Sequence, residues 1–404
     1  MKILCCNPLF LEYRLPLYVE LKRLFGGAFH VLYSPKRYFW RRKTQLEQRI
    51  REELGENAHT HMKEHVYDAH THRWDTPYDP SFFRCTFIAW GLFASIDRVK
   101  PDVLITIGYF QWTPWVLLYG VLHGIPVYMS YERTPHTERN CGKLKLWQRK
   151  FFNRFFTGFF VNGIETRKYL ESIGVSPTKL YTAGMSADSE RMRSGVEAFR
   201  QKPEECKKFR NGIIGDAAQP GIVFLFTGNV SEAKGIMYLM QAWQVHIHRH
   251  PHDHLVVIGD GHKMEECRRL AQEMPSIHME GRIPYEQVSK YYAISDVCIL
   301  PTLTDNWSLV IPEAMACGLA VATSIYNGCH PELIHEGVNG YTFDPLKPET
   351  IVDVLHRFHL SDLSAMGKAS VELERPFSVE NSAKRIYEVF LHHLPKEKTD
   401  TASR

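Results

Sequence analysis

The sequence predicts an α/β protein with two Rossmann-like domains, and three observations support this. The chain has 404 residues, which is more than one ordinary hydrophobic core requires. Short β-rich runs alternate with helical patterns, and this alternation implies parallel sheets covered by helices. The alternation weakens once, in a charged and turn-rich stretch that ends near residue 221, and then begins again.

The first series predicts an N-terminal Rossmann-like domain over residues 1–215. Its strands are expected at residues 2–6, 29–33, 103–107, 127–131 and 159–162. The clearest helix places five apolar residues on one face and ends at two glycines: Leu17, Tyr18, Leu21, Leu24 and Phe25, followed by Gly26 and Gly27. Residues 42–75 are polar and rich in histidine, and no element is assigned to them.

The second series predicts a C-terminal Rossmann-like domain over residues 216–375. Its strands are expected at residues 222–227, 254–258, 277–281, 297–300 and 320–323. Residues 376–404 should form a last helix and a disordered tail. Ser378 can cap this helix, which we expect to pack back on the first domain.

The composition is that of a soluble globular protein, with 44% hydrophobic and 23% charged residues. No apolar run approaches the roughly 18–20 residues that a membrane-spanning helix needs. Nine cysteines without a C-x-x-C pair indicate reduced thiols and a cytoplasmic protein. The net charge of +4 is too small to suggest nucleic-acid binding.

Basic and aromatic side chains interleave from Lys143 to Phe156 on a predicted helix. Such a helix either packs its aromatic residues into the core, which is the more common arrangement, or lies on an anionic membrane surface. The second interpretation predicts peripheral contact with the inner face of the membrane.

Five histidines occupy every second position from His246 to His254, as in a metal-binding tract. This spacing distributes histidines over different faces of a helix, and Pro251 ends the helix. We therefore expect a solvated helix end and turn, with no metal bound.

Residues 222–235 form the first segment whose sequence indicates a ligand-binding loop. A buried strand runs into Gly228, a loop follows, and a helix starts near Gly235. Loops at the carboxyl ends of parallel strands are where such sheets bind ligands. Lys234 directly precedes the helix, where a cation and the helix dipole both favour a phosphate group. The alternative is a solvated lysine at a helix start.

Residues 301–318 form the second such segment. Pro312 fits the first turn of a helix, so the helix should begin around residues 308–311 with free backbone N–H groups facing the preceding loop. These groups would bind an anion, whereas the carboxylates of Asp305 and Glu313 would accept hydroxyl groups of a sugar or ribose. The combination indicates a nucleotide-sugar pocket. The alternative is a helix start with favourable acidic residues and no ligand.

Three segments together resemble glycosyltransferase family 4, a group of retaining enzymes with the GT-B fold. They are the loop 228–235, the run Val256-Val-Ile-Gly-Asp-Gly261, and the run from Asp305 through Glu313-Ala-Met-Ala-Cys-Gly318. The resemblance is strong over residues 222–345 and weak over the first 150. It implies two Rossmann-like domains that face each other across a cleft, with the nucleotide-sugar donor on the second domain and the acceptor on the first.

The family's Glu-x7-Glu motif corresponds here to Asp305 and Glu313. The resemblance implies that Glu313 binds the ribose and that Asp305 lies near the transferred sugar. The arginine and lysine that the family places on the diphosphate correspond to Asn229 and Lys234, so one cation is missing. Arg282 or Arg14 are the candidates to replace it.

The resemblance therefore implies two sets of site residues. The donor would be bound by Gly228, Asn229, Lys234, Gly261, Arg282, Asp305, Asn306, Ser308, Leu309 and Glu313. Lys234 and Asp305 are the catalytic candidates among them. Acceptor candidates follow predicted strands of the first domain: Tyr13, Arg14, Tyr109, Glu132 and His136.

By resemblance, the protein transfers a hexosyl group from a nucleotide-sugar to a hydroxyl of a saccharide or lipid-linked saccharide, with retention of configuration, in cell-envelope polysaccharide or glycolipid synthesis. Lys234 and the N–H groups near Ser308 and Leu309 would stabilise the leaving diphosphate. No metal or other cofactor is expected. The alternatives are a nucleotide-sugar epimerase and a non-catalytic subunit that binds a nucleotide-sugar.

Overall fold

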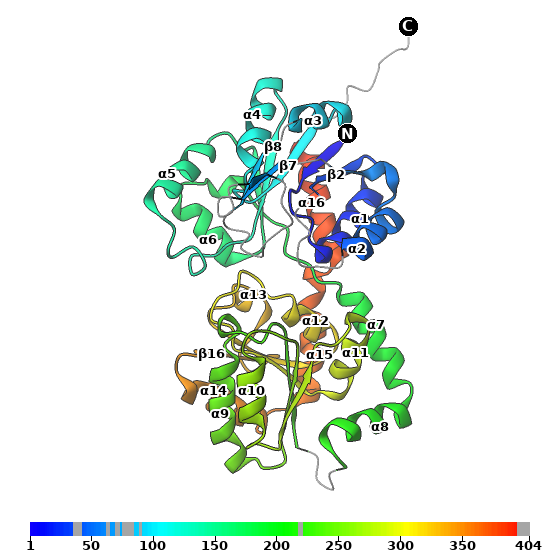
Figure 1. Ribbon diagram of the computed structural model, residues 1–404, viewed down its shortest axis with the longest axis vertical. Coiled ribbons are helices and arrows are strands. Elements are labelled where there is room, and N and C mark those ends of the chain that lie inside the picture. The colour runs from blue at the N-terminus through cyan, green and yellow to red at the C-terminus, as the bar shows by residue number, and fades with distance from the viewer. Residues whose placement is uncertain are drawn as a thin grey trace.

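The computed structural model describes residues 1–34, 43–61, 65–68, 73–74, 85–88, 91–216 and 221–393. Two parallel sheets with helices packed on them form two domains, which lie one above the other in Figure 1. The predicted α/β fold of two Rossmann-like domains is confirmed. No described helix has both the length and the apolar character that crossing a bilayer requires.

The first sheet has seven strands in the order β10-β9-β8-β7-β1-β2-β3, all paired in parallel. Their bounds are β1 Ile3–Cys6, β2 Phe29–Tyr33, β3 His59–His61, β7 Val103–Ile107, β8 Val127–Tyr131, β9 Gly158–Val161 and β10 Leu180–Thr182. A separate antiparallel sheet consists of β4 His65–Asp68, β5 Arg73–Trp74 and β6 Cys85–Ile88. It includes part of the histidine-rich stretch to which the sequence assigned no element.

Both faces of the first sheet are buried. Ile3 and Cys5 of β1 belong to one hydrophobic cluster, and Leu4 and Cys6 to another, because successive side chains of a strand point to opposite faces. The first cluster includes α1 Leu15–Leu24 and α16 Val379–His393. The second lies under α3 Leu92–Val99, α4 Thr113–His123, α5 Lys143–Phe152 and α6 Ile164–Ser172. Short helical segments cover residues Glu12–Arg14, Lys43–Arg49 (α2), Ile50–Leu54, Glu56–Ala58 and Pro177–Lys179.

The second sheet has six parallel strands in the order β13-β12-β11-β14-β15-β16. They are β11 Val223–Thr227, β12 His254–Ile258, β13 Ile277–Gly281, β14 Val297–Leu300, β15 Ala320–Ser324 and β16 Gly340–Phe343. Its helices are α9 Ile236–Arg249, α10 Met264–Ala271, α11 Tyr285–Ile294, α12 Val310–Ala316, α13 His330–Leu333, α14 Pro348–Phe358 and α15 Leu363–Glu374. Short 3-10 turns cover Glu232–Lys234 and Arg375–Phe377.

The chain enters the second domain earlier than the sequence predicts. Met192, Val196 and Phe199 of α7 (Ser189–Arg200) and Ile214 of α8 (Pro203–Ile214) belong to the core of the second domain. The predicted domain boundary at residue 215 therefore lies too far along the chain. The chain first passes from the first domain to the second just before α7. The spacing of the three α7 residues is helical, but the many charged residues around them hide it.

The last helix returns to the first domain. Ala383, Ile386 and Phe390 of α16 are buried in a core cluster of the first sheet, and Phe390 contacts Tyr128 of β8 edge-on. The hydroxyl oxygen of Ser378 accepts a hydrogen bond from the amide of Asn381 at 3.2 Å, which is the expected helix cap.

One expectation for the histidine tract is wrong. Helix α9 ends at Arg249, as Pro251 requires, but His246 is buried and not solvated. His246 and His250 lie one turn apart on the same helix face, and α9 packs against α14 there.

Candidate functional site

A cavity of about 510 Å³ lies at the carboxyl ends of three neighbouring strands, β11, β12 and β13. Its lining includes Gly228, Asn229, Gly261 and Arg282, all predicted to bind a donor. Since β11, β12 and β13 are parallel, the loops that follow them meet at the same edge of the sheet. We call this space the donor cavity.

Glycines allow the loops that follow β11 and β12, which line the donor cavity, to lie in direct contact. A Cβ atom on Gly259 would lie 1.7 Å from the carbonyl oxygen of Gly228, and one on Gly261 would lie 2.3 Å from that of Val230. Gly259 also has a φ of +136°, in the region that favours glycine. The amide of Val230 donates to Asp260 O at 3.0 Å and joins the two loops.

The loop after β14 brings Asp305 to Lys234. The amide of Leu303 donates to Ala233 O at 2.8 Å, and a Cβ on Gly235 would lie 1.8 Å from Pro301 O, so the two loops lie against each other. The Lys234 ammonium group donates to Asp305 Oδ2 and forms an ion pair with it. The two predicted catalytic residues are therefore in direct contact.

Glu313 of α12 is held by two tyrosines of α11. Its carboxylate accepts hydrogen bonds from the hydroxyl groups of Tyr285 at 3.1 Å and Tyr292 at 3.5 Å. Burial raises the pKa of Glu313 to about 7, although the hydrogen bond from Tyr285 opposes this rise. Glu313 is therefore a carboxyl group that changes its charge near neutral pH.

At the start of α12, one backbone N–H group does not point where the sequence predicts. The helix begins at Val310, within the predicted range, with Pro312 in its first turn. However, the amide of Ser308 donates to Asn327 Oδ1 at 3.2 Å, and Ser308 is buried. This N–H group therefore faces the protein and is not directed at a diphosphate, because the Asn327 side chain already satisfies it. Leu309, directly before the helix, remains a predicted donor.

The structure separates the two candidates for the missing cation. Arg282 lies in the wall of the donor cavity beside Asn229, and no described carboxylate lies within ion-pair distance of it. Arg14 lies in the first domain, buried and paired with Glu132. Arg282 is therefore placed to act on a ligand of the donor cavity, whereas Arg14 is not.

A second cavity, of about 450 Å³, lies between the domains and contains three of the predicted acceptor residues, Arg14, Tyr109 and Glu132. Asn306 of the second domain completes its wall. Asn306 was predicted to bind the donor, but it lines a cavity whose other residues belong to the first domain. We call this space the acceptor cavity.

Arg149 was not among the predicted site residues, yet it organises the acceptor cavity. It donates to Glu138 Oε2 at 2.7 Å and lies over the ring of Tyr109, at 5.0 Å from the ring centre. The sequence placed Arg149 in the basic and aromatic segment, where its charge suggested solvent or membrane. Arg149 reaches Glu138 because it lies on the side of α5 that faces the domain.

The remaining acceptor candidates lie apart from the acceptor cavity. Tyr13 lines a separate pocket of about 30 Å³, beside Arg14. His136 spans the two domains: its ring stacks on Tyr326, with ring centres 4.6 Å apart, and its Nε2 lies 2.9 Å from Leu303 O. His136 therefore contacts the loop that carries Asp305.

The domains also touch at Gly163, just before α6. The amide of Ile164 donates to Glu332 Oε1, and burial raises the pKa of Glu332 to about 7. A Cβ atom on Gly163 would lie 2.0 Å from Glu332 Oε1 and 2.7 Å from Trp307. The absence of a side chain at residue 163 thus permits the domains to approach each other.

A Gly163→Ala variant should open this contact. The φ of Gly163 is −171°, so alanine adds no backbone strain and acts only through the collision. We expect a more open average shape in small-angle X-ray scattering and a melting temperature close to that of the wild type. Gly212→Ala is the matched control, because a Cβ there meets no atom within 4 Å. An unchanged scattering curve for Gly163→Ala would contradict this role.

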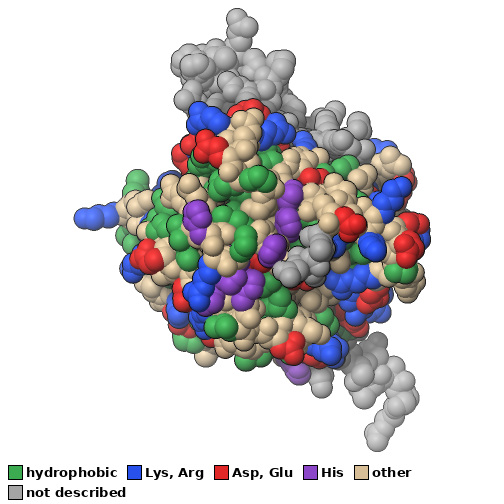
Figure 2. All heavy atoms as spheres, turned by 90° about the horizontal axis from the view of Figure 1, so that it is seen from below, with side chains coloured by type: hydrophobic (Ala, Val, Ile, Leu, Met, Phe, Trp, Pro, Cys, Tyr) green, Lys and Arg blue, Asp and Glu red, His purple; other side chains and the backbone are tan. Residues whose placement is uncertain are grey.

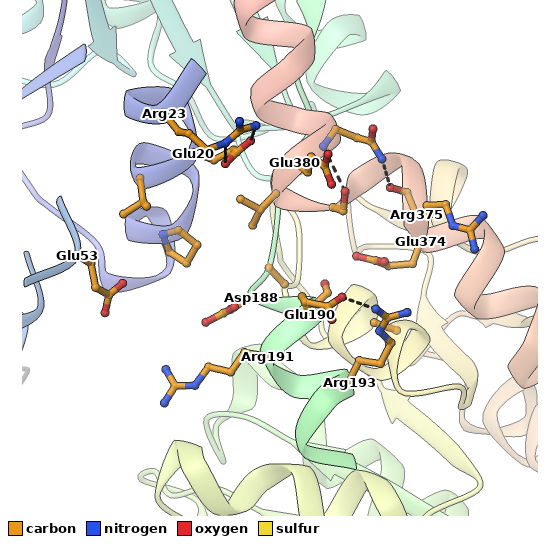
Figure 3. Close-up of a pocket in the computed structure, with 18 of the residues that line it drawn as sticks. Glu20, Arg23, Glu53, Asp188, Glu190, Arg191, Arg193, Glu374, Arg375 and Glu380 are labelled. Carbon is orange, nitrogen blue, oxygen red and sulfur yellow. Dashed lines mark hydrogen bonds and ion pairs between the residues drawn. The ribbon is translucent and has the colours of Figure 1, made fainter. Parts of the chain in front are cut away.

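A larger cavity, of about 890 Å³, lies where the chain crosses between the domains. Figure 3 shows the charged residues around it, and several of them pair within their own elements, such as Arg23 with Glu20 and Arg193 with Glu190. The two segments in which the chain passes between the domains both line this cavity. None of its lining residues was predicted to belong to the functional site. We interpret it as the space around the hinge.

Residues 221–359 match the family described as Glycosyl transferases group 1. The lipopolysaccharide 1,2-N-acetylglucosaminetransferase of Salmonella typhimurium is 28% identical over 208 residues, which are 48% of this chain and 53% of that protein. The D-inositol 3-phosphate glycosyltransferase of Corynebacterium jeikeium is 24% identical over 240 residues, 56% of this chain and 55% of that protein. The chain thus spans about half the length of these curated relatives.

Several solved structures resemble nearly the whole chain, including the two that follow. Anabaena Alr3699/HepE in complex with UDP has a TM-score of 0.71 and 13% identity, covering 97% of this chain and 100% of that one. The apo form of the lipopolysaccharide outer core galactosyltransferase WaaB has a TM-score of 0.67 and 13% identity, covering 98% and 100%. The chain therefore has the GT-B fold, and its residues 221–359 are similar to group 1 glycosyl transferases.

Proposed function

We propose that this protein is a glycosyltransferase that moves a hexosyl group from a nucleotide-sugar to a hydroxyl acceptor with retention of anomeric configuration. The observation that carries the proposal is the position of two adjacent residues. Asp305 contacts Lys234, which follows the loop of Gly228 and Asn229 in the wall of the donor cavity. The next residue, Asn306, lines the acceptor cavity. One loop thus joins the places where a donor sugar and an acceptor would meet.

The residues support a division of roles. The nucleotide would lie along the donor cavity, with Glu313 accepting hydrogen bonds from the ribose. Lys234 and Arg282 would stabilise the negative charge that develops on the diphosphate as the glycosidic bond breaks, and Asn229 would add an uncharged donor. We propose that these side chains make a metal unnecessary for transfer. Asp305 would orient the transferred sugar.

Similar proteins support the substrate classes. Alr3699/HepE was solved with UDP and with UDP-glucose, which favours a uridine nucleotide as the first donor to test here. The Salmonella relative and WaaB are named for lipopolysaccharide, which favours a saccharide or lipid-linked saccharide acceptor of a cell-envelope pathway.

The test is to incubate the protein with UDP-, ADP- and GDP-sugars, with and without saccharide and glycolipid acceptors. The expected result is release of nucleoside diphosphate that depends on the acceptor, with a retained anomeric configuration by NMR. An altered sugar formed without acceptor would support an epimerase. A donor that binds but is never consumed would support a non-catalytic subunit. Either outcome would overturn the proposal.

The surface of α5 supports contact with a membrane. None of its residues is buried, and Leu144, Trp147 and Phe151 are 80%, 66% and 43% exposed. The expectation that the aromatic residues of this segment fill the core is therefore wrong for Trp147 and Phe151, whereas Phe152 packs against the core and Phe156 is buried in it. α4, which covers the same face of the first sheet, exposes Trp115, Leu118, Val121 and Leu122. We propose that the exposed apolar side chains of α5, flanked by the lysines and arginines of the same helix, bind the anionic inner face of a membrane.

Vesicle binding tests this surface. The wild type should sediment with anionic vesicles and much less with neutral ones, since charge and apolar burial act together. A Trp147→Ala/Phe151→Ala variant should bind anionic vesicles at least about 10-fold more weakly, because each large side chain contributes about 1.5–3 kcal/mol when buried. Val338→Ala/Leu360→Ala, at two exposed apolar residues of the second domain, is the control. Equal binding by both variants would exclude this surface.

A further inference from the structure

Four histidines and one aspartate gather at the amino edge of the second sheet. His246 lies in α9 and His250 directly follows it, Asp253 lies in the turn before β12, and His356 lies in α14 with His359 directly after it. Figure 2 shows histidine side chains on this lower face of the molecule. The donor cavity lies at the carboxyl ends of the same strands.

Asp253 is the centre of this cluster. Its Oδ2 lies 2.8 Å from His246 Nε2 and 2.7 Å from His359 Nε2, and its Oδ1 accepts the amide of Ile222 at 2.9 Å. His246 and Asp253 are each only 1% exposed, whereas the His359 side chain is 24% exposed. The site is therefore built of buried ligand atoms with one open side.

The charge of Asp253 is not balanced by lysine or arginine. Within the described part of the chain, its only ion-pair partners are His246 and His359. A third imidazole, that of His250, stacks on His359 with ring centres 3.6 Å apart, and its Nε2 lies 3.1 Å from His356 Nδ1. A buried carboxylate therefore lies in a cluster of imidazole rings, two of which hydrogen-bond to it directly.

Imidazole nitrogens and carboxylate oxygens are common ligands of zinc. One oxygen or nitrogen atom from each of His246, Asp253 and His359 lies within 4.8 Å of the others. Two ligands of one tetrahedral zinc lie about 3.3 Å apart, since metal–ligand distances are about 2.0–2.2 Å. Small side-chain movements would therefore make room for an ion. Coordination would replace the two Nε2···Oδ2 hydrogen bonds, with each Nε2 atom binding the ion instead.

We propose that His246, Asp253 and His359 bind a divalent transition metal ion of the zinc class. The ion ties the end of α9, the turn before β12 and the end of α14 together. Water, or His250 after rotation of its ring, completes the coordination. Because the site lies at the opposite edge of the sheet from the donor cavity, the ion stabilises the second domain and takes no part in sugar transfer.

The test measures zinc affinity of the chelator-treated full chain by competition with a chromophoric chelator. The wild type should bind one zinc ion per chain and melt at a higher temperature with zinc than without it. His359→Gln keeps a donor to Asp253 but removes a ligand. It should weaken binding by at least about 10- to 100-fold, because even second-shell changes have effects of this size. Its melting temperature should not rise with zinc.

His248→Gln is the matched control, since His248 is an exposed residue of the same tract. It should bind zinc as the wild type does. Equal zinc affinities of wild type and His359→Gln would show adsorption by surface histidines and overturn the proposal, as would a wild type that binds no zinc. Both variants without zinc should keep the far-ultraviolet circular dichroism spectrum of the wild type, which establishes that they are folded by a measurement that does not depend on the proposed activity.

Discussion

Replacing Lys234 by alanine is expected to lower kcat for sugar transfer by about 10²- to 10³-fold, the effect of removing one preorganised charge-stabilising group. Lys234 is the cation that contacts Asp305, and its side chain is 26% exposed, so a diphosphate can reach it. The affinity for the intact donor should change less than kcat, because the charge on the diphosphate increases as the sugar leaves. Steady-state kinetics with the preferred donor measure both.

Two further variants show whether the loss comes from the charge or from the broken ion pair. Lys263→Ala removes a nearby lysine that pairs with Glu232 at 3.0 Å and Glu266 at 2.9 Å, and should leave kcat within a few-fold. If alanine at 234 acts only by leaving Asp305 unpaired, it should cause no further loss in an Asp305→Asn background. We expect a large further loss of kcat in that background, and no further loss would remove Lys234 from the chemistry.

Replacing Glu313 by glutamine is expected to weaken donor binding about 10- to 100-fold at pH 8, since a hydrogen bond to a charged group contributes about 1.5–3 kcal/mol. In the wild type, burial raises the pKa of Glu313 to about 7, so the carboxyl is ionised at pH 8 and protonated at pH 5. Wild-type affinity for the donor should therefore rise with pH through about 7, while that of Glu313→Gln should not. Calorimetry from pH 5.5 to 8.5 measures this.

The same substitution has the opposite effect on stability. A carboxyl whose pKa is higher in the folded chain than in the unfolded chain binds more protons when folded, between about pH 4.5 and 7. Its contribution to the free energy of unfolding is full below that range and is lost as pH rises through 7. Glu313→Gln should therefore gain stability relative to the wild type at pH 8 but not at pH 5. Glu332 titrates in both proteins and cancels in this comparison.

Local patterns were sufficient to predict most of the fold. Apolar runs marked β11, β12, β14 and β15 within a residue at either end, because buried parallel strands are continuously apolar. β13 also has its predicted bounds, although it contains His278 and Glu280. Among the missed strands, β3 and β10 have only three residues each and lie at the edges of the first sheet. β16, at an edge of the second sheet, was missed although three of its four residues are buried. The charged surface of α7 hid its apolar stripe and displaced the predicted domain boundary.

The candidate site was predictable only in part. Gly228, Asn229, Gly261 and Arg282 could be placed together because each follows a strand of one parallel sheet. The role of Arg149 could not be predicted, since its partner Glu138 lies on a loop whose path no local pattern specifies. The donor assigned to Ser308 was wrong for the same reason, because Asn327 comes from a different loop.

The sequence by itself determined the two parallel sheets, the loops at their carboxyl edges and the helix start beside Glu313, because these follow from periodicity, proline and glycine over a few residues. Only the tertiary structure decided which side chains meet: Lys234 with Asp305, 71 residues apart, and Asp253 with His359, 106 residues apart. The physical reason is that periodicity shows which face of an element is buried, whereas the order of strands and the packing of helices select the partner on that face.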